Sequence, residues 1–180
     1  PDQVAIRLNP VESLLAQDYP NFELIICDDA SADTTAEICQ EYADKDHRIR
    51  FYRNEKNIGM YANWMKLLDL SGGRYFLWSA NDDLRKPAFL SNMVAELERH
   101  PEAGVAMSAT ELIHEDRSHF GYVHYQGVAN PNDMSYYRLM MRSAGIGRGR
   151  KKYAVYIYGM YRSDLLKSAM RFFEDTLFSD

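Results

Sequence analysis

The sequence predicts an α/β domain with a mainly parallel sheet flanked by helices. Apolar runs of strand length alternate with helical patterns through the first 110 residues, which is the signature of such a domain. Two acidic pairs each follow one of these apolar runs. The 180 residues, 46% hydrophobic and 26% charged, suffice for one compact globular domain, and we expect residues 1–180 to form it.

Composition narrows the function classes. The net charge of −5 gives no overall basic footprint, so we expect no nucleic-acid partner. No apolar run approaches the length of a membrane span, and no signal peptide is recognisable. Cys27 and Cys39 lie on apolar stretches, and we expect two buried thiols in a reducing compartment rather than a disulfide or a metal pair.

The first half of the chain gives the clearest pattern. Residues 9–21 predict a short helix that is broken at Tyr19-Pro20, and residues 22–27 and 48–53 predict strands. The helix between these strands can be capped by Asp33 or by Thr34, whose capping box Glu37 would complete. Its expected apolar stripe comprises Ile38, Cys39, Tyr42 and Ala43.

Further elements follow in order. Residues 60–70 predict a helix, residues 74–79 a strand, and Pro87 the first turn of another helix. Residues 103–113 predict one strand, and residues 114–132 have no regular pattern. Beyond them we expect a helix, a loop, a strand and a last helix, over residues 131–142, 143–152, 153–161 and 162–173.

The acidic pairs indicate where a ligand would bind. Ligands of open α/β sheets bind outside the carboxyl ends of the strands. Strand 22–27 ends at Asp28-Asp29 and strand 74–79 ends near Asp82-Asp83, so we expect both pairs at one edge of one sheet. Such carboxylates can accept hydrogen bonds from a nucleoside or hold Mg²⁺ or Mn²⁺. The alternative for each pair is a role in turns and helix caps.

These residues resemble family 2 glycosyltransferases of the GT-A fold. The stretches that carry the resemblance are ESLLAQDYPNFELIICDDASADTT, RNEKNIGMYANWMKLLDLSGGRYFLWSANDDLRKPAFL and YIYGMYRSDLL. The similarity is dense from residue 11 to about 110 and loose beyond it. It implies a nucleotide-sugar-binding half over about residues 1–110 and an incomplete acceptor half over about 111–180.

The resemblance also implies roles for single residues. Asp29 would accept the N–H of a base, expected to be uracil, and Asp28 would support that loop. The other nucleotide-binding positions it implies are Asn57, Gly59, Asn63 and Asn81. Counting back from Pro87, Asp82 takes the place of the metal ligand, and Asp83 that of a structural or secondary contact; the cofactor would be Mn²⁺ or Mg²⁺.

The chain departs from the family pattern at one acid. The first aspartate of the usual metal-binding run is Ala80 here, which weakens the prediction of a metal site. For the general base that deprotonates the acceptor hydroxyl, Asp180 is the best positional match, with Asp175 and Glu174 as rivals. A frayed polar end of the chain is the alternative for these three.

The family's usual first strand has no counterpart here, because the chain starts at the helix that follows it. That strand would lie in the middle of the sheet, and an empty place would leave backbone groups unpaired. We therefore expect a segment to fill it, for instance a strand from a partner chain. A complete closed sheet without any added strand would refute this expectation.

The function that the resemblance implies is an inverting, metal-assisted transfer of a sugar from a nucleotide-diphosphosugar, expected to be a UDP-sugar. The acceptor would be the hydroxyl of a glycan or a lipid-linked glycan in cell-surface polysaccharide synthesis. The setting would be the cytoplasm or the cytosolic face of the inner membrane, and peripheral membrane association and a homodimer remain open. Alternatives are a non-catalytic nucleotide or interaction module of the same fold and, less favoured, a sugar-phosphate nucleotidyltransferase.

Overall fold

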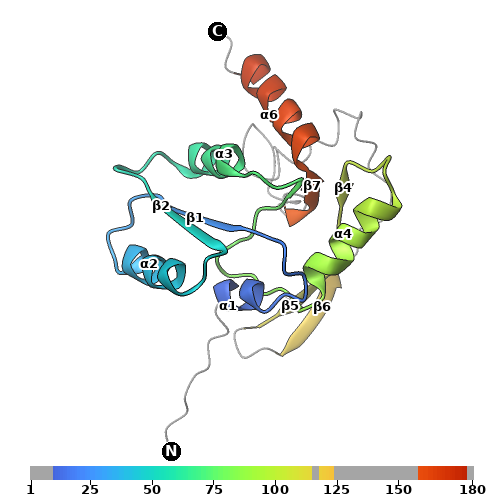
Figure 1. The fold of residues 1–180 in the computed structure, drawn as a ribbon, viewed down its shortest axis with the longest axis horizontal. Coiled ribbons are helices and arrows are strands. Elements are labelled where there is room, and N and C mark those ends of the chain that lie inside the picture. The colour runs from blue at the N-terminus through green and yellow to red at the C-terminus, as the bar shows by residue number, and fades with distance from the viewer. Residues whose placement is uncertain (1–9, 115–117, 124–157, 178–180) are drawn as a thin grey trace, which may run out of the picture. The chain divides into compact units, whose positions relative to one another are not determined.

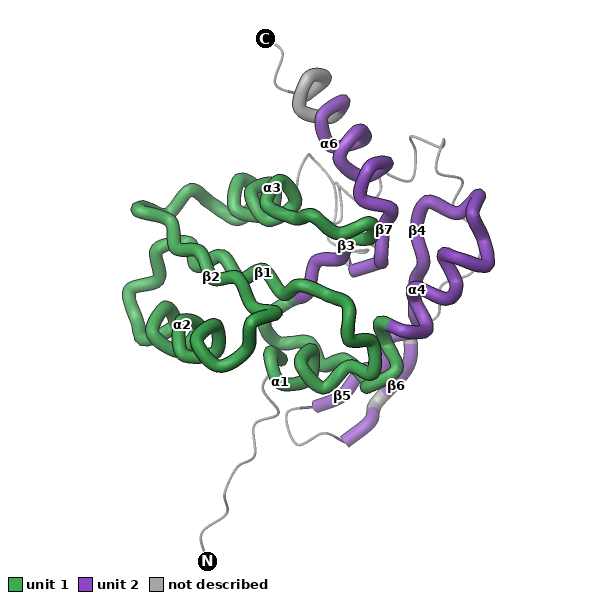
Figure 2. The backbone as a smooth tube through the Cα atoms, in the orientation of Figure 1, with its two compact units in different colours: residues 1–76, 80–90 green, residues 77–79, 91–180 purple. Residues whose placement is uncertain are grey.

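The computed structural model describes residues 10–114, 118–123 and 158–177 of the chain. The chain divides into two compact units, one of residues 1–76 and 80–90 and the other of residues 77–79 and 91–180 (Figure 2). Each unit is described by itself. The expected division of a single domain into halves near residue 110 stays a prediction.

Unit 1 is built on two parallel strands. β1 (Leu24–Asp28) pairs with β2 (Ile49–Arg53) in the register Leu24↔Ile49 to Asp28↔Arg53. Helices α2 (Thr35–Lys45) and α3 (Met60–Leu70) cover opposite faces of this pair (Figure 1). The predicted strands at 22–27 and 48–53 and the helix at 60–70 are confirmed, so unit 1 has the expected parallel, helix-flanked arrangement.

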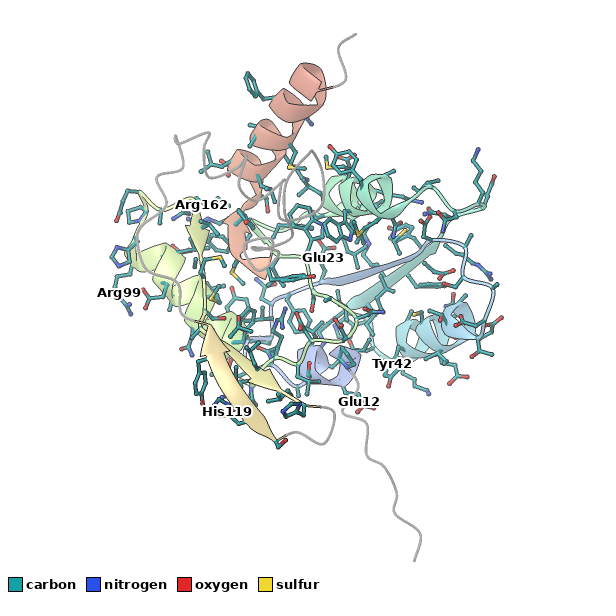
Figure 3. The ribbon with its side chains drawn as sticks, turned by 180° about the vertical axis from the view of Figure 1, so that it is seen from behind. Glu12, Glu23, Tyr42, Arg99, His119 and Arg162 are labelled. Atoms are coloured by element: carbon teal, nitrogen blue, oxygen red, sulfur yellow. The ribbon has the colours of Figure 1, made fainter. Side chains whose placement is uncertain are left out.

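The short helix α1 (Pro10–Leu15) is joined to α2 and to the turn before α4 (Phe89–Arg99). The Tyr42 hydroxyl donates to Glu12 at 3.0 Å, as the labelled side chains show (Figure 3). Gln17 is buried, and its amide donates to the carbonyl of Lys86 and accepts the N–H of Leu90. The apolar core of unit 1 contains Leu14, Ala36, Ile49, Leu68 and Leu90.

The start of α2 uses Asp33, one of the two predicted caps, and not the predicted capping box. The Thr34 side chain makes no capping hydrogen bond, so the expected capping box with Glu37 is wrong. Instead the Asp33 carboxylate accepts the N–H of Thr35 at 3.0 Å. The expected apolar stripe is wrong at Ile38, which is 50% exposed, because Ala36 is the residue that α2 buries.

The third predicted strand is also shorter than expected. β3 comprises only Tyr75–Phe76, and it is not part of the β1–β2 sheet. The two acidic pairs therefore do not end neighbouring strands of one sheet among the described residues. The sequence predicted a strand to residue 79 because the run is apolar up to that point. Trp78 is indeed buried, but a buried segment need not form hydrogen bonds with a neighbouring strand. The predicted helix at Pro87 begins two residues later, at Phe89.

One edge of β1 has no strand beside it in the described part of the chain. Leu24 donates to Arg48 and Asp28 accepts from Asn54, so alternate residues of β1 bond to β2. Ile25 and Cys27 therefore point their backbone groups to the other edge. There the Asn63 amide donates to the Cys27 carbonyl at 3.0 Å. The expectation that a further strand completes this edge stays a prediction.

Unit 2 has antiparallel pairs. β4 (Val105–Ala106) pairs with β7 (Met160–Arg162), and β5 (Thr110–Ile113) pairs with β6 (His119–Val123). The helix α6 (Ser163–Leu177) follows β7 directly. The single strand predicted over 103–113 is wrong, because it changes partner between β4 and β5, and β6 was not predicted. The predicted helix at 131–142, the loop at 143–152 and residues 153–157 lie outside the described residues.

Buried apolar side chains of unit 2 come from β7, α4, α6 and the segment 77–79, and they comprise Trp78, Met93, Leu97, Met160, Tyr161, Leu166, Ala169 and Met170. Arg162 joins the end of α4 to β7, because its guanidinium donates to the carbonyls of Leu97, His100 and Ala103. Within the described ranges, no helix has the length and apolarity needed to cross a bilayer.

Candidate functional site

Asp28, the last residue of β1, holds the loop that follows it. Its side chain is buried, and its carboxylate accepts the N–H of Ser31 and lies 3.3 Å from the Arg53 guanidinium. The turn is tight, because Ala30 adopts a φ of 60°, a left-handed conformation that is uncommon outside glycine. The structure thus places Asp28 where its carboxylate supports this loop, and its expected part in nucleotide binding stays a prediction.

Asp29 connects this loop to the start of α3. Oδ1 accepts the N–H of Ile58 at 2.9 Å and the Asn54 amide at 2.8 Å, and Oδ2 accepts the N–H of Gly59 at 3.0 Å. The Ile58 N–H, followed by the Asn54 amide, lowers the pKa of the Asp29 carboxyl below its ordinary value. Asp29 is therefore an ionised acceptor at neutral pH, and it also aligns the 57–59 loop.

Gly59 is required by its backbone conformation. Its φ of 86° and ψ of 157° lie in a region that is essentially restricted to glycine. A Cβ here would meet no atom within 4 Å, so backbone strain and not space excludes other residues. This conformation directs the Gly59 N–H to both Asp29 Oδ2 and Asn57 Oδ1, each at 3.0 Å.

Asn54 links these groups, and it was not among the predicted site residues. Its buried amide donates to Asp29 and to Asn63, and its Oδ1 accepts the Lys66 ammonium at 2.6 Å. A weaker contact of 3.7 Å comes from the Cys27 thiol. Asn54 directly follows β2, so the rule that ligands bind at the carboxyl ends of strands would also have selected it.

The structure therefore brings together five of the predicted residues, Asp28, Asp29, Asn57, Gly59 and Asn63. We call these five residues and Asn54 the β1 cluster. Cys27 and Cys39 beside it are free and half-buried, and burial raises the pKa of each thiol. The thiols are thus protonated at neutral pH and unsuited to act as nucleophiles.

The second group, Asn81, Asp82 and Asp83, lies in the turn after β3. Asn81 and Asp82 are exposed, whereas Asp83 is half-buried and lies 3.5 Å from the Arg85 guanidinium. No hydrogen bond or ion pair between described residues joins this group to the β1 cluster. It supplies carboxylates but not a complete cage, because the described residues contain no group of three or more His, Cys, Asp or Glu side chains that could hold a metal.

This set of donors fits a particular kind of cation. Mg²⁺ and Mn²⁺ are hard ions, and many of their sites use one or two carboxylates together with substrate phosphates. An exposed carboxylate at Asp82 meets that need, whereas a site made by protein side chains alone does not fit these residues. The cation therefore fits only as an ion that is shared with a phosphate-bearing ligand.

The candidates for the general base fall at the end of the chain. Asp180 lies outside the described residues. Asp175 and Glu174 fall in the last part of α6, where the structure describes the backbone alone. The assignment of a base stays a prediction.

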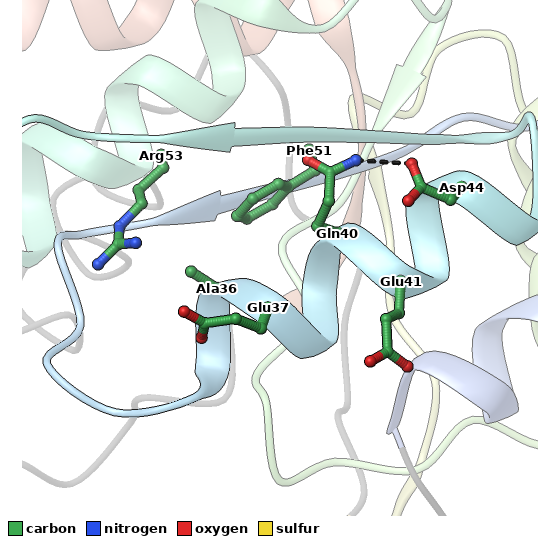
Figure 4. Close-up of a pocket in the computed structure, with 7 residues that line it drawn as sticks. All are labelled: Ala36, Glu37, Gln40, Glu41, Asp44, Phe51 and Arg53. Atoms are coloured by element: carbon green, nitrogen blue, oxygen red, sulfur yellow. Dashed lines mark hydrogen bonds between the residues drawn. The ribbon is translucent and has the colours of Figure 1, made fainter.

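A hollow of about 400 Å³ opens between α2 and β2, apart from the predicted residues (Figure 4). Phe51 and Ala36 supply its apolar surface, and it is rimmed by Glu37, Gln40, Glu41, Asp44 and Arg53. Arg53 connects it to the β1 cluster, because it also pairs with Asp28. We assign it no function.

Comparison with known proteins gives a family match over most of the chain. The profile described as "Glycosyl transferase family 2" matches residues 8–162. The putative glycosyltransferase EpsE of Bacillus subtilis is 41% identical over 91 residues, which are 50% of this chain and 33% of EpsE. The putative teichuronic acid biosynthesis glycosyltransferase TuaG of B. subtilis is 37% identical over 100 residues, 56% of this chain and 38% of TuaG. The chain thus spans about a third of the length of either relative.

Solved structures share the fold. Residues 1–349 of S. aureus TarS in complex with UDP match with a TM-score of 0.59 at 23% identity, over 88% of this chain and 43% of that chain. The same part of TarS in complex with UDP-GlcNAc also gives a TM-score of 0.59, at 22% identity. At this identity the match is evidence for the fold alone.

Proposed function

Because the chain belongs to glycosyl transferase family 2, we propose that the β1 cluster forms the donor side of a glycosyltransferase. It would bind a nucleotide-diphosphosugar and allow the sugar to pass to an acceptor hydroxyl. The observation that carries the proposal is the arrangement of Asp29, an ionised carboxylate at the carboxyl end of β1 that is held in place by the 57–59 loop.

Asp29 has the capacity to recognise a base. A carboxylate offers about four lone-pair sites, and the described residues use two on Oδ1 and one on Oδ2. One site on Oδ2 is therefore left for an external donor, such as the imide N–H of uracil. Ile58 and Met60 flank Gly59 with exposed apolar side chains, against which the face of a base would pack.

The diphosphate would be held with the help of Asp82. The negative charges of the diphosphate would repel the Asp82 carboxylate unless a cation lies between the diphosphate and the carboxylate. The exposed Asp82 side chain is suited to bind such a cation. Mn²⁺ or Mg²⁺ would supply charge neutralisation of the leaving diphosphate. Asn81 beside Asp82 offers an amide that can bond to the same ligand.

The wider activity follows from the relatives. A UDP-sugar is the favoured donor, because the TarS structures contain UDP or UDP-GlcNAc. An inverting transfer needs a general base, for which Asp180 and Asp175 remain the candidates. The acceptor would be a glycan or lipid-linked glycan in polysaccharide synthesis, as the name of TuaG suggests. Such an enzyme would act in the cytoplasm or at the cytosolic face of the membrane.

The test of base recognition changes the ligand and leaves the protein intact. We expect UDP to bind, and we expect methylation of N3 of its uracil to weaken binding about tenfold or more, since the methyl group removes the N–H and leaves the fourth lone-pair site of Asp29 without a donor. Isothermal titration of both ligands measures this difference. Equal affinity for the two would show that Asp29 does not recognise the base.

Ala80 favours a second hypothesis, a non-catalytic module that binds a nucleotide without transferring sugar. One carboxylate of the family's metal-binding run is missing at this position. Mixing the protein with radiolabelled UDP-sugar and following release of UDP separates the hypotheses. Release that requires Mn²⁺ supports the transferase, and tight binding without any turnover supports the module.

A further inference from the structure

We infer that the adjacent aspartates of the 81–85 turn have separate tasks, and that Arg85 separates them. Asp83 serves as the internal counter-ion of Arg85, and Asp82 alone is left to bind the cation. This rests on the proposed function for the identity of the cation but not for the Asp83–Arg85 pair, which the structure contains whatever the ligand.

Arg85 is buried in a way that demands a counter-ion. Its side chain is only 10% exposed, and its guanidinium stacks over the Phe89 ring with 5.2 Å between the guanidinium carbon and the ring centroid. Nη1 reaches the Leu84 carbonyl at 3.4 Å, and the buried Nε makes no hydrogen bond to the described residues. A charge removed from water in this way is unfavourable unless an opposite charge accompanies it.

Asp83 is the carboxylate that fills this need. Its Oδ2 lies 3.5 Å from Arg85 Nη2, and no other ion pair of Arg85 is found in the described part of the chain. Because the guanidinium has few other partners, loss of Asp83 would leave it buried and uncompensated. The backbone N–H of Arg85 also donates to Ser13 Oγ at 3.2 Å, which holds the main chain of this residue in the turn.

Asp82 is in the opposite situation. It is exposed and makes no hydrogen bond or ion pair with the described residues, so its carboxylate is free for an external cation. Asp83 is 41% exposed and remains near the same turn, but the positive charge beside it opposes binding of a second cation. Arg85 is thus a positioning residue that limits the cation site to one carboxylate.

The first experiment measures stability without any ligand. We expect Asp83→Asn to lower the melting temperature by about 4 °C, whereas the matched variant Asp82→Asn leaves it unchanged. Arg85→Met keeps the apolar contact with Phe89 and removes the charge. Combined with Asp83→Asn, it should recover most of the loss, because the uncompensated charge is then gone.

The second experiment measures Mn²⁺ binding to the same proteins in the presence of UDP, by the electron paramagnetic resonance signal of the free ion, with UDP and no protein as the baseline. Asp82→Asn should weaken Mn²⁺ binding at least tenfold. Tenfold is the smallest typical loss of metal affinity when a residue that only supports a metal ligand is mutated, and Asp82 would be a ligand itself. Asp83→Asn should leave it within about twofold, and Arg85→Met should strengthen it, because Asp83 is then released.

The outcomes separate the parts of the inference. Equal melting temperatures for Asp82→Asn and Asp83→Asn, or no recovery in the double variant, would overturn the counter-ion role of Asp83. Equal weakening of Mn²⁺ binding by both variants would overturn the division of tasks. If the native protein does not bind Mn²⁺ with UDP present, the role of Asp82 fails together with the metal part of the proposed function. The melting temperatures still decide the role of Asp83 in that case.

Discussion

Gly59 is the residue whose conformation most directly shapes the candidate site. Its N–H is shared by Asp29 and Asn57, and its φ of 86° is what directs it there. The sequence predicted Gly59 and Asp29 as neighbours of one nucleotide. The hydrogen bonds between them could not be predicted, because they join residues that lie 30 positions apart.

We expect Gly59→Ala to lower the free energy of unfolding by about 1–3 kcal/mol, since alanine is strained in this region of backbone conformation. The matched control is Gly72→Ala, because a Cβ at Gly72 would meet only Glu23 Oε1, at an ordinary 3.6 Å. Its effect should stay within about 1 kcal/mol. Urea denaturation measures both, and equal losses would contradict the role given to the Gly59 backbone.

The interaction between Asp46 and Arg48 predicts that the stability of the protein depends on pH at acidic values. The side chain of Arg48, hydrogen-bonded to it at 2.7 Å, lowers the pKa of the Asp46 carboxyl from 3.8 to about 2. Because the pKa of the folded state is depressed, the pair stabilises the protein fully above pH 4 and loses this effect as the pH falls toward 2.

We therefore expect the native protein to lose more stability than Asp46→Asn between pH 4 and pH 2, since the variant has no carboxyl to protonate there. Thermal denaturation at several pH values measures the difference. Parallel curves for the two proteins over this range would contradict it.

At the scale of elements, the sequence predicted best where local pattern and tertiary environment agree. The alternating run at 48–53 and the apolar helix at 60–70 appear as β2 and α3 within a residue of their expected bounds. We predicted a single strand over residues 103–113 because the segment is largely apolar throughout. The sequence does not show where the neighbouring strand changes from β7 to β6. β6 was missed because Gly121 interrupts its strand-forming residues.

The sequence also predicted part of the candidate site. The rule for strand ends selected Asp28 and Asp29, and the structure places both in one cluster with Asn57, Gly59 and Asn63. Asn54 was overlooked because an asparagine beside a turn is ordinary in sequence. Its role depends on the simultaneous approach of Asp29, Asn63 and Lys66, which only the fold provides.

The hydrogen bonds of Arg162 predict how much the connection between α4 and β7 contributes to stability. Its guanidinium bonds to the carbonyls of Leu97 at 2.6 Å and Ala103 at 2.8 Å, and so fastens the end of α4 to β7 (Figure 3). We expect Arg162→Met to lower the free energy of unfolding by about 2–4 kcal/mol, because these carbonyls lose charged donors.

Arg99→Met is the control, since Arg99 is 63% exposed and, among the described residues, forms an ion pair with Glu96 alone. Its effect should be about 0.5 kcal/mol or less. Chemical denaturation compares the two variants, and similar losses would show that Arg162 does not hold α4 and β7 together.

At the scale of the whole molecule, the chain belongs to glycosyl transferase family 2, and the residues that we propose for the donor side gather at the carboxyl end of β1. The residues that would complete the reaction, the acceptor side and the general base, fall largely outside the described part. The central claim is therefore nucleotide binding at the β1 cluster, with a cation at Asp82.

The measurement that tests this claim most directly is a calorimetric titration of UDP into the native protein, first with Mn²⁺ and then with EDTA, beside Asp82→Asn. We predict binding that weakens about tenfold or more in EDTA, and an equal weakening in the variant that Mn²⁺ does not restore. Affinity that is the same with Mn²⁺, with EDTA and in the variant would contradict the cation site. No binding of UDP under any of these conditions would contradict the donor site itself.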